Sequence, residues 1–469
     1  MRTHSARPIC MLVRPPAGYA TGNKPNIREG LYLLPQALPY LARVIEKSGC
    51  EPVVLDLEVN RGRMSDFLHA FAAISPDVVL FTVSTPSYCY CREMALAIKR
   101  NGCQIPIIFG GPHATYQWDA ILSAGVADIV VLREGGFAVK QLLDCLLHDK
   151  QLDKCGSIAY VDAKGVPRCT ADSSLADSFE EFGTPGYEYV DMKAYQQRVG
   201  KCTLEIVRGC RIGCKFCLNT KYYPTLRYKP VADLSKELDL LVRHYGFNKI
   251  SVISPELLSN EAYIISVLDA FTGFLEGTNV TWACATSAMS LTPNLLTKMS
   301  RAHCRSLFLG VESGAATVQC VAGDKLQLPA LQERLKAIGD IGIGVLASFI
   351  IGLPGETEDT ALRTIDLAAT LREKYKFIKT IQFNTFGPFP GTDFANDSAR
   401  YGFRVLPIDF AYYPVVPAVE SDTFPRELHY RLWHRVWQEL FPSYYDEYRA
   451  IEAAALAGQN PRLAAFCGD

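Results

Sequence analysis

The chain has 469 residues, of which 49% are hydrophobic and 21% charged, and its formal net charge is −1. This composition is typical of a globular protein of two or three domains, and it disfavours both a disordered chain and a surface that binds nucleic acid. No apolar run approaches the ~20 residues that span a bilayer, and no secretory apolar region opens the chain, so we expect a cytoplasmic protein with no membrane partner.

Residues 1–150 alternate short apolar strands with helical segments, which is the pattern of a parallel α/β sheet. Such sheets bind ligands at the carboxyl ends of their strands, where glycines let the backbone approach a ligand closely. The loops to inspect therefore begin at Arg14, Thr82, Gly110 and Arg133. We predict strands at 9–13, 52–57, 78–83, 105–109 and 129–132, and helices at 33–48 and 93–99.

The rest of the chain divides into three regions by pattern. Residues 151–200 are rich in turn signals, including a hairpin turn at 162–165, and are predicted to be a linker. Strands and helices alternate again over 201–392. Residues 393–469 form an aromatic, helical tail, which is expected either to pack as an amphipathic helix on the preceding domain or to cap it and shape a substrate pocket.

Three cysteines, Cys210, Cys214 and Cys217, follow the predicted strand at 204–207 in a single short loop. A four-iron cluster is normally held by four thiolates, so three in one loop predict either a distant fourth ligand or an iron kept open for a substrate or cofactor. The same thiolates fit zinc if His303 or Cys304 supplies a fourth ligand. Zinc loops usually use paired C-x2-C arms, whereas this loop has one such arm and one wider gap.

The spacing C-x3-C-x2-C, with the aromatic Phe216 before the last cysteine, resembles the signature of the radical S-adenosylmethionine (radical SAM) superfamily. The resemblance implies that the open iron binds SAM and that an electron from the cluster cleaves SAM to a deoxyadenosyl radical, which abstracts hydrogen from an unactivated carbon. It also implies an external electron donor of the flavodoxin or ferredoxin kind. The expected fold of residues 201–392 is a partial (β/α)6 barrel with its chemistry at the carboxyl ends of the strands.

The same resemblance implies SAM contacts at the ends of two later strands. Glu312, in the run Gly310–Gly314, is expected to bond the ribose or amino acid part of SAM, with capping of the next helix as its structural alternative. Ile350 and Gly352 are expected to pack against the adenine ring.

Two further SAM contacts are expected nearer the cluster. Phe216 would present backbone groups to the adenine edge. Many relatives place an Asp-rich or Gly-Gly-Glu segment after the second strand, whereas this chain has Ser254-Pro255-Glu256. Glu256, or Ser254 as a neutral alternative, is therefore expected to meet the SAM ammonium group.

Ahead of such a core, the loops of residues 1–150 resemble those of the Rossmann-like cobalamin-binding domain in cobalamin-dependent radical SAM proteins. The resemblance implies loops that embrace the corrin and its nucleotide tail, with the loop after the third strand beneath cobalt. A module of this fold that binds no cobalamin stays an alternative. The chain has no D-x-H-x-x-G motif, so we expect no protein imidazole on cobalt, and His113 has helix capping as its structural alternative. The expected contacts are Thr82, Ser84, Thr85, Gly110, Gly111, His113, Glu134 and Gly135.

Together these features predict a methyltransferase that moves a methyl group from methylcobalamin to an unactivated carbon of a small molecule or natural product. No catalytic side chain is assigned. A cyclisation or rearrangement that uses the same cofactors stays open. The tRNA methylthiotransferases share this domain order, but they carry a second cysteine cluster in the first domain and a basic tail. The first-domain cysteines of this chain do not match that cluster, and its tail is aromatic instead of basic; the cysteines are Cys10, Cys50, Cys89 and Cys91.

Overall fold

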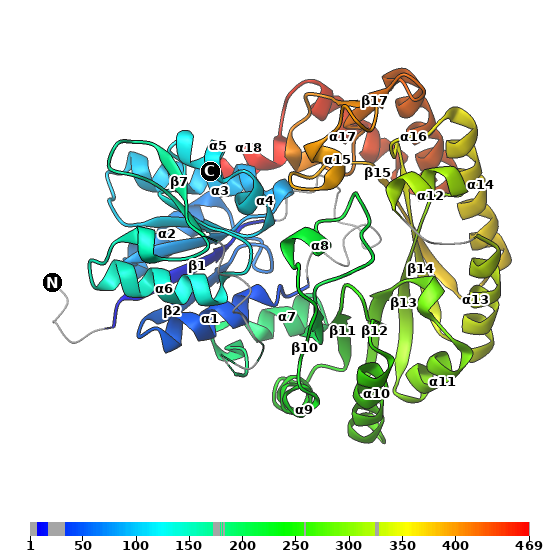
Figure 1. Ribbon diagram of the computed structural model, residues 1–469, viewed down its shortest axis with the longest axis horizontal. Coiled ribbons are helices and arrows are strands. Elements are labelled where there is room, and N and C mark those ends of the chain that lie inside the picture. Colours follow the sequence, from blue (N-terminus) through cyan, green and yellow to red (C-terminus); the bar gives the residue numbers. More distant parts are fainter. Residues whose placement is uncertain are drawn as a thin grey trace. The chain divides into compact units, whose positions relative to one another are not determined.

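The computed structural model describes residues 7–16, 33–171, 179, 181, 183–257, 259–323 and 328–468 (Figure 1). The chain forms two compact units. Of the described residues, the first unit combines 7–16, those within 34–199, and 460–468, and the second contains those within 200–459.

The first unit is built on a seven-stranded sheet with the order β2-β1-β3-β4-β5-β6-β7. The first five strands pair in parallel, and β6 and β7 add an antiparallel edge. The strand order reverses between β1 and β3, which is where parallel sheets of this kind place a ligand. The strands are β1 (Ile9–Arg14), β2 (Glu51–Asp56), β3 (Val78–Thr82), β4 (Ile107–Gly110), β5 (Ile129–Val131), β6 (Ile158–Val161) and β7 (Pro167–Cys169).

The helices of the first unit cover a sheet whose central strands are buried on both sides. Because both faces of β3 and β4 are covered, these strands are continuously apolar instead of alternating. The rings of Phe67, Phe81 and Phe109 form the aromatic centre of the core on one face, with centroids 6.0 and 5.3 Å apart. The helices are α1 (Ala37–Lys47), α2 (Met64–Ile74), α3 (Tyr88–Arg100), α4 (Pro112–Tyr116), α5 (Trp118–Ser123), α6 (Gly135–Leu147), α7 (Met192–Arg198) and α18 (Pro461–Cys467).

Two parts of the first unit lie outside the range expected for it. The hairpin turn predicted at 162–165 joins β6 to β7, so part of the predicted linker completes the first sheet. The C-terminal helix α18 packs on α2 and α3 of the same unit (Figure 1, red). Its Phe466 is only 5% exposed and belongs to the core of this unit.

The second unit is built on six parallel strands in the order β15-β14-β13-β12-β11-β8. Each strand lies beside its neighbour in the chain, and helices connect them along the outer side, as Figure 1 shows for α13 and α14. This is the arrangement of a partial (β/α)6 barrel, as the sequence predicts. The strands are β8 (Cys202–Glu205), β11 (Lys249–Ile253), β12 (Thr281–Thr286), β13 (Cys304–Glu312), β14 (Gly344–Ile351) and β15 (Ile378–Thr385). The helices are α9 (Val231–Asp239), α10 (Glu261–Leu275), α11 (Pro293–Arg301), α12 (Ala316–Ala322), α13 (Leu328–Ile341) and α14 (Glu358–Lys374).

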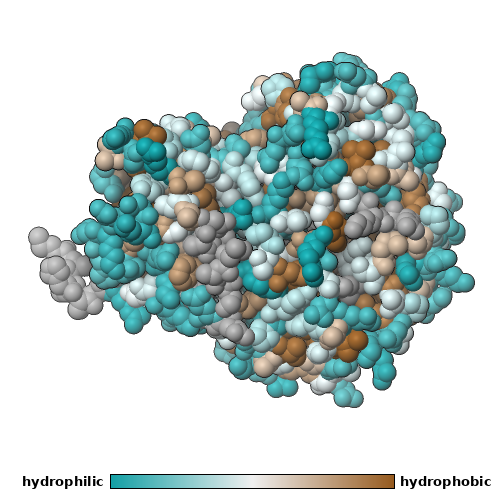
Figure 2. Space-filling view, in the orientation of Figure 1, coloured by the Kyte–Doolittle hydropathy of each residue, from teal (hydrophilic) through white to brown (hydrophobic). Residues whose placement is uncertain are grey.

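The aromatic tail packs on this unit through α16 (Arg426–Leu440) and α17 (Tyr445–Leu456), before the chain leaves for α18. Trp437 stacks on Tyr448 with ring centroids 4.9 Å apart, and the buried Trp433 donates its indole N–H to the carbonyl of Val415 at 2.9 Å. The smaller elements of the tail are α15 (Asp393–Asn396), β16 (Phe403–Val405) and β17 (Val419–Ser421). On the face drawn in Figure 2, hydrophobic residues are scattered among hydrophilic ones in small groups. None of the helices in the described part of the chain combines the length and apolar character that crossing a membrane requires.

Candidate functional site

The cysteine loop follows β8 and the two-residue strand β9 (Val207–Arg208), at the carboxyl end of the barrel sheet. Two glycines shape the loop. Gly209 has φ +99°, and a Cβ there would stand 2.6 Å from the carbonyl oxygen of Thr225. Gly213 has φ +81°, also in the left-handed region. The backbone of this loop therefore depends on glycine at both positions.

Backbone N–H groups point at two of the three sulfurs. The N–H of Ile212 donates to Cys210 Sγ at 3.4 Å, and the N–H of Asn219 donates to Cys217 Sγ at 3.5 Å. Hydrogen bonds to sulfur stabilise the thiolate form and tune a bound iron–sulfur cluster. Burial raises the pKa of the Cys210 thiol to about 11, so without a metal this side chain is protonated at neutral pH. The positive charge of a bound metal would stabilise it as a thiolate. The loop thus fits an iron–sulfur cluster.

The ligands considered for a zinc site lie at the opposite end of the sheet. Cys304 begins β13, whereas Glu312 ends it, and the Glu312 carboxylate is close enough to Cys217 to raise the pKa of that thiol, after the larger effect of burial. Eight residue steps along a strand span ~26 Å. His303 precedes Cys304 and places its Nδ1 2.9 Å from the carbonyl oxygen of Val280. Neither His303 nor Cys304 is therefore placed to share a zinc ion with the cysteines of the loop.

Glu312 holds an unusual backbone conformation at the end of β13. Its φ is +60°, a backbone region that residues other than glycine seldom adopt. Such residues often lie at functional sites. The pairing of β13 with β14 shifts register between Gly310 and Glu312. The carboxylate folds back over Gly310, where any Cβ would collide with it. The absence of a side chain at Gly310 thus leaves the space in which the Glu312 carboxylate lies.

The two polar residues after β11 have different surroundings. The Glu256 carboxylate accepts a hydrogen bond from the backbone N–H of Arg211 in the cysteine loop. Ser254 is 4% exposed, and its hydroxyl has no hydrogen-bond partner within the described residues. A buried, unpaired hydroxyl is costly, and a polar ligand would remove that cost. Of the two alternatives for the SAM ammonium group, Ser254 has a hydroxyl without a partner among the described residues, whereas one carboxylate oxygen of Glu256 already bonds the cysteine loop.

The expected adenine contacts come together only in part. Phe216 and Ile350 pack against the same apolar cluster, which includes Leu353 and Phe386. Gly352, with φ +86°, lies under the ring of His429, which occupies the place of a side chain. A cofactor would therefore meet Gly352 only on faces other than the one that His429 covers.

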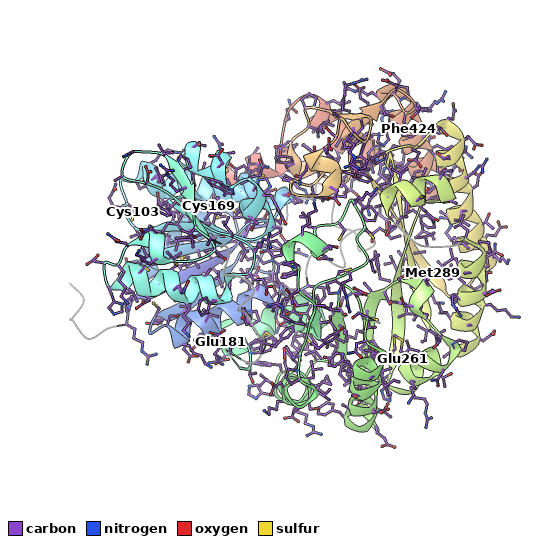
Figure 3. All side chains as sticks on the ribbon, viewed as in Figure 1. Cys103, Cys169, Glu181, Glu261, Met289 and Phe424 are labelled. Carbon is purple, nitrogen blue, oxygen red and sulfur yellow. The ribbon has the colours of Figure 1, made fainter. Side chains whose placement is uncertain are left out.

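Three buried polar residues around Gly352 were not among the predicted contacts. The backbone N–H of Gly352 donates to a carboxyl oxygen of Glu356, whose side chain is fully buried. His429, from α16, lies 2.8 Å from the hydroxyl of Thr385 and beside the ring of Phe424, which Figure 3 labels. The run Gly-Leu-Pro-Gly-Glu at 352–356 was a sequence signal for Glu356, but nothing in the sequence links His429 to it.

In the first unit, the loops after β3 and β4 are tied to each other, and β3 borders the point where strand order reverses. The N–H of Val83 donates to the carbonyl of Gly110 at 2.7 Å. Gly111 has φ +105°, and a Cβ there would stand 2.8 Å from the carbonyl oxygen of Val83. Thr82 ends β3, and the exposed Ser84 bonds the hydroxyl of Ser87. This close approach of backbones explains why the loop carries glycine.

His113 bridges these two loops. Its Nδ1 lies 3.2 Å from the hydroxyl of Thr85, its backbone N–H donates to the carbonyl of Val83, and its ring packs on Tyr88 with centroids 4.5 Å apart. The residue is 2% exposed, and burial lowers its pKa to about 4, so the imidazole is neutral. Gly111, and not His113, occupies the N-cap position of α4.

The third loop leads into α6, with the buried Glu134 as N-cap. A Cβ on Gly135 would stand 3.2 Å from a methyl carbon of Leu41, so helix and neighbour approach closely here. The N–H of Arg133 donates to the hydroxyl of Thr115 in α4 at 2.8 Å. All the residues expected to contact cobalamin therefore lie at the carboxyl ends of β3, β4 and β5 or in the first residues that follow them.

A buried ion pair, which the sequence did not predict, lies at the same edge. Arg14 ends β1 and lies 3.3 Å from the Asp56 carboxylate that ends β2. Tyr195 donates its hydroxyl to the same carboxylate at 2.5 Å. Because Tyr195 is 139 residues away from Asp56, no local pattern points to it.

Comparisons with known proteins match two successive regions of the chain. The B12-binding domain family matches residues 29–143, and the radical SAM superfamily matches residues 204–368. An uncharacterized methyltransferase, PH0819, from Pyrococcus horikoshii is 24% identical over 361 residues, which are 76% of this chain and 77% of that protein. An anaerobic magnesium-protoporphyrin IX monomethyl ester cyclase from Rubrivivax gelatinosus is 22% identical over 411 residues, 84% of this chain and 71% of that protein.

Solved structures share the fold. The radical SAM methyltransferase TsrM from Kitasatospora setae, with tryptophan and a SAM analogue bound, has a TM-score of 0.73 at 16% identity, over 92% of this chain and 89% of that one. The cobalamin-dependent radical SAM enzyme OxsB, with aqua-cobalamin bound, has a TM-score of 0.73 at 15% identity, over 94% of this chain and 67% of that one. The two family matches, the shared fold and the cysteine loop identify this chain as a member of the cobalamin-dependent radical SAM superfamily, an enzyme related to methyltransferases whose cofactors are a [4Fe–4S] cluster, SAM and cobalamin.

Proposed function

We propose that this enzyme is a C-methyltransferase that moves a methyl group from methylcobalamin to an unactivated carbon of a small molecule, such as a natural-product intermediate. The observation that carries the proposal is the presence of both cofactor domains in a chain that aligns over 76% of its length with a protein named as a methyltransferase. The bound cofactors would supply a radical that abstracts hydrogen and a methyl group that replaces it.

In this proposal Cys210, Cys214 and Cys217 hold three irons and leave the fourth for SAM. The unpaired hydroxyl of Ser254 would accept a hydrogen bond from the SAM ammonium group, because it is buried and has no partner in the described structure. Glu312, held over Gly310 near Cys217, would bond the ribose or amino acid part. The shared apolar cluster of Phe216 and Ile350 supports a place for adenine beside them.

The Glu256 carboxylate has a different proposed part. Because it already accepts the N–H of Arg211, it would fix the cysteine loop and contact SAM only in addition to that bond. Gly352 would contact adenine through its backbone, since its side-chain position is filled by His429.

In the first unit the three loops would hold the corrin and its nucleotide tail. Close backbone packing at Gly111, close side-chain packing at Gly135 and the small Gly110 support this assignment. His113 would hold the loops together and not bind cobalt, because its Nδ1 bonds Thr85 and its ring is buried against Tyr88. The remaining proposed contacts are Thr82 at the end of β3, Ser84 and Thr85 just after it, and Glu134 at the N-cap of α6.

The overall reaction determines how many SAM molecules and electrons the enzyme consumes in each turnover. One SAM gives its methyl group and leaves S-adenosylhomocysteine, and a second SAM gives methionine and, with the hydrogen taken from the substrate, 5′-deoxyadenosine. Two electrons per turnover then come from an external donor of the flavodoxin or ferredoxin kind.

A second candidate is a cyclisation or rearrangement without net methyl transfer. It is favoured by the alignment of 84% of this chain with the cyclase of Rubrivivax gelatinosus. Both candidates require the same cofactors, so cofactor content alone does not separate them.

An assay without substrate does separate them. The full chain is reconstituted anaerobically with iron, sulfide and cobalamin, reduced with titanium citrate, and given SAM with a deuterated methyl group. A methyltransferase yields S-adenosylhomocysteine together with label on the corrin, which mass spectrometry detects. Cleavage of SAM to 5′-deoxyadenosine with no label on the corrin would favour the cyclase alternative. Cys214→Ala is the control, and it removes iron and 5′-deoxyadenosine.

A further inference from the structure

The C-terminal helix α18 completes the core of the cobalamin-binding unit. The chain passes from the second unit to the first between Gln459 and Asn460. Phe466 is 5% exposed within the same core that holds Phe81 and Phe109, and Leu463 packs against this core. A helix of seven residues has little stability of its own, so α18 is held in place by this packing.

Besides its packing on α2, α18 makes two side-chain contacts with the first turn of α3. Phe466 packs edge-on against Tyr90, with ring centroids 5.2 Å apart and planes at 88°. The side-chain amide of Asn460 donates to Cys89 Sγ at 3.9 Å, while its Oδ1 caps α18 at the N–H of Leu463. Contacts with α18 thus hold two consecutive residues of α3, Cys89 and Tyr90.

The residue before them faces the cobalamin-binding loops. Tyr88 packs its ring on His113, and His113 in turn contacts Thr85 and Val83 in the loop after β3. Since Tyr88, Cys89 and Tyr90 share one helical turn, the position of α18 fixes the orientation of Tyr88. A continuous set of contacts therefore joins Phe466 to the loop after β3.

We propose that α18 is a positioning element of the cobalamin site, with Phe466 and Asn460 as its positioning residues. Neither residue touches the corrin in this proposal. They hold the first turn of α3, and through Tyr88 and His113 the loop after β3, in the conformation that binds cobalamin. The inference rests on the cobalamin assignment, but not on the methyl-transfer step.

The test is the affinity of the full-length protein for hydroxocobalamin, measured by equilibrium dialysis without turnover. If Phe466→Ala lowers the population of the binding conformation to about one tenth, the apparent Kd rises about tenfold. Phe466→Leu, which keeps an apolar side chain, restores most of the affinity. The visible circular dichroism of the bound corrin changes in Phe466→Ala, because that signal depends on the geometry of the site.

Ile98→Ala is the matched control. Ile98 is 1% exposed in the same core and on the same helix, but it lies at the end of α3 away from the loop. It is expected to lower the melting temperature as Phe466→Ala does, yet to leave the corrin Kd within about twofold, since the first turn keeps its contacts. Equal loss of affinity in both variants would mean general destabilisation and would overturn the inference.

Asn460→Ala covers the case in which Phe466→Ala does not fold. It removes the bond to Cys89 and the cap of α18, and a rise of about threefold in Kd is expected. Unchanged corrin affinity in Asn460→Ala and in any folded Phe466 variant would refute the positioning role. Failure of the wild-type protein itself to bind corrin would instead refute the cobalamin assignment, and the inference with it.

Discussion

The imidazole of His429 lies directly over Gly352, in the space where any other residue would place its side chain. His429 comes from the aromatic tail and Gly352 directly follows β14, so this contact joins the tail to the expected SAM edge of the barrel. The turn at Gly352 and the helix α16 therefore depend on each other.

Gly352→Ala should destabilise the second unit by about 3 kcal/mol, because the methyl group collides with His429 and the backbone is left-handed. Gly342→Ala is the matched control, since Gly342 also has positive φ but has open space around it, and it should cost only about 1 kcal/mol. Urea denaturation measures both. In the His429→Ala background the extra cost of Gly352→Ala should disappear, and its persistence would contradict the contact.

The charge state of His429 predicts how stability varies in acid. Its Nδ1 donates to the carbonyl of Val419 at 3.1 Å and its Nε2 accepts from Thr385, so the ring is neutral, and burial lowers its pKa to about 4. The stability due to the neutral ring is complete above the unfolded pKa of about 6.5 and is lost as pH falls toward 4. His429→Gln should flatten that loss between pH 7 and about 5, as followed by thermal unfolding. An unchanged slope would contradict this assignment.

Glu356 predicts the opposite trend in alkali. Burial raises its pKa to about 8, although the N–H groups of Gly352 and Leu353 oppose the shift, so at neutral pH the side chain is mostly a carboxylic acid. Its stabilising effect is complete below the unfolded pKa of about 4.5 and is lost as pH rises through 8. Glu356→Gln keeps the shape of the acid, and it should be more stable than wild type at pH 9 in chemical denaturation. Equal stability of the two proteins at pH 9 would argue against a buried acid.

Ser254→Ala should have two effects of opposite sign. Without SAM, removal of an unpaired buried hydroxyl should stabilise the protein by about 1 kcal/mol. SAM affinity should fall about tenfold, because a hydrogen bond to a charged group is lost. Calorimetry on the reconstituted protein measures both. Ser259→Ala is a control, since that hydroxyl already has partners in Tyr228 and Glu256.

Each of Cys210→Ala, Cys214→Ala and Cys217→Ala should lose the iron–sulfur absorbance and SAM cleavage after anaerobic reconstitution. Cys320→Ala should keep both, because Cys320 is exposed on α12 outside the loop. Iron and sulfide analysis provides the measurement. Full iron content in any one of the three loop variants would exclude the proposed ligand set.

Local patterns predicted the parts of the fold that depend on local sequence. The apolar run at 78–83 predicts β3 because a strand buried on both faces needs no polar position. The strand predicted at 105–109 begins later, at Ile107, because Pro106 has no N–H to give to the sheet. The cysteine loop was recognisable because its ligands lie within eight residues of each other.

Contacts between distant parts of the chain were not predictable in this way. Tyr195 beside Asp56, His429 over Gly352 and Phe466 against Tyr90 each join segments that no periodicity connects. Seven residues around Phe466 are too few to show which surface they cover. The part of the site set by strand ends was therefore foreseeable, and the part set by the tail was not.

The place of Phe466 in the first core has a consequence for biosynthesis. As the ribosome extends the chain, residues 34–199 emerge early, but the side chain that fills their core arrives some 260 residues later, after Gly200–Gln459 have been made. Domains usually fold in order as they emerge during translation. Until α18 has been made, the N-terminal residues expose an apolar surface beside α2 and α3, so loading of the corrin is expected to follow the synthesis of α18.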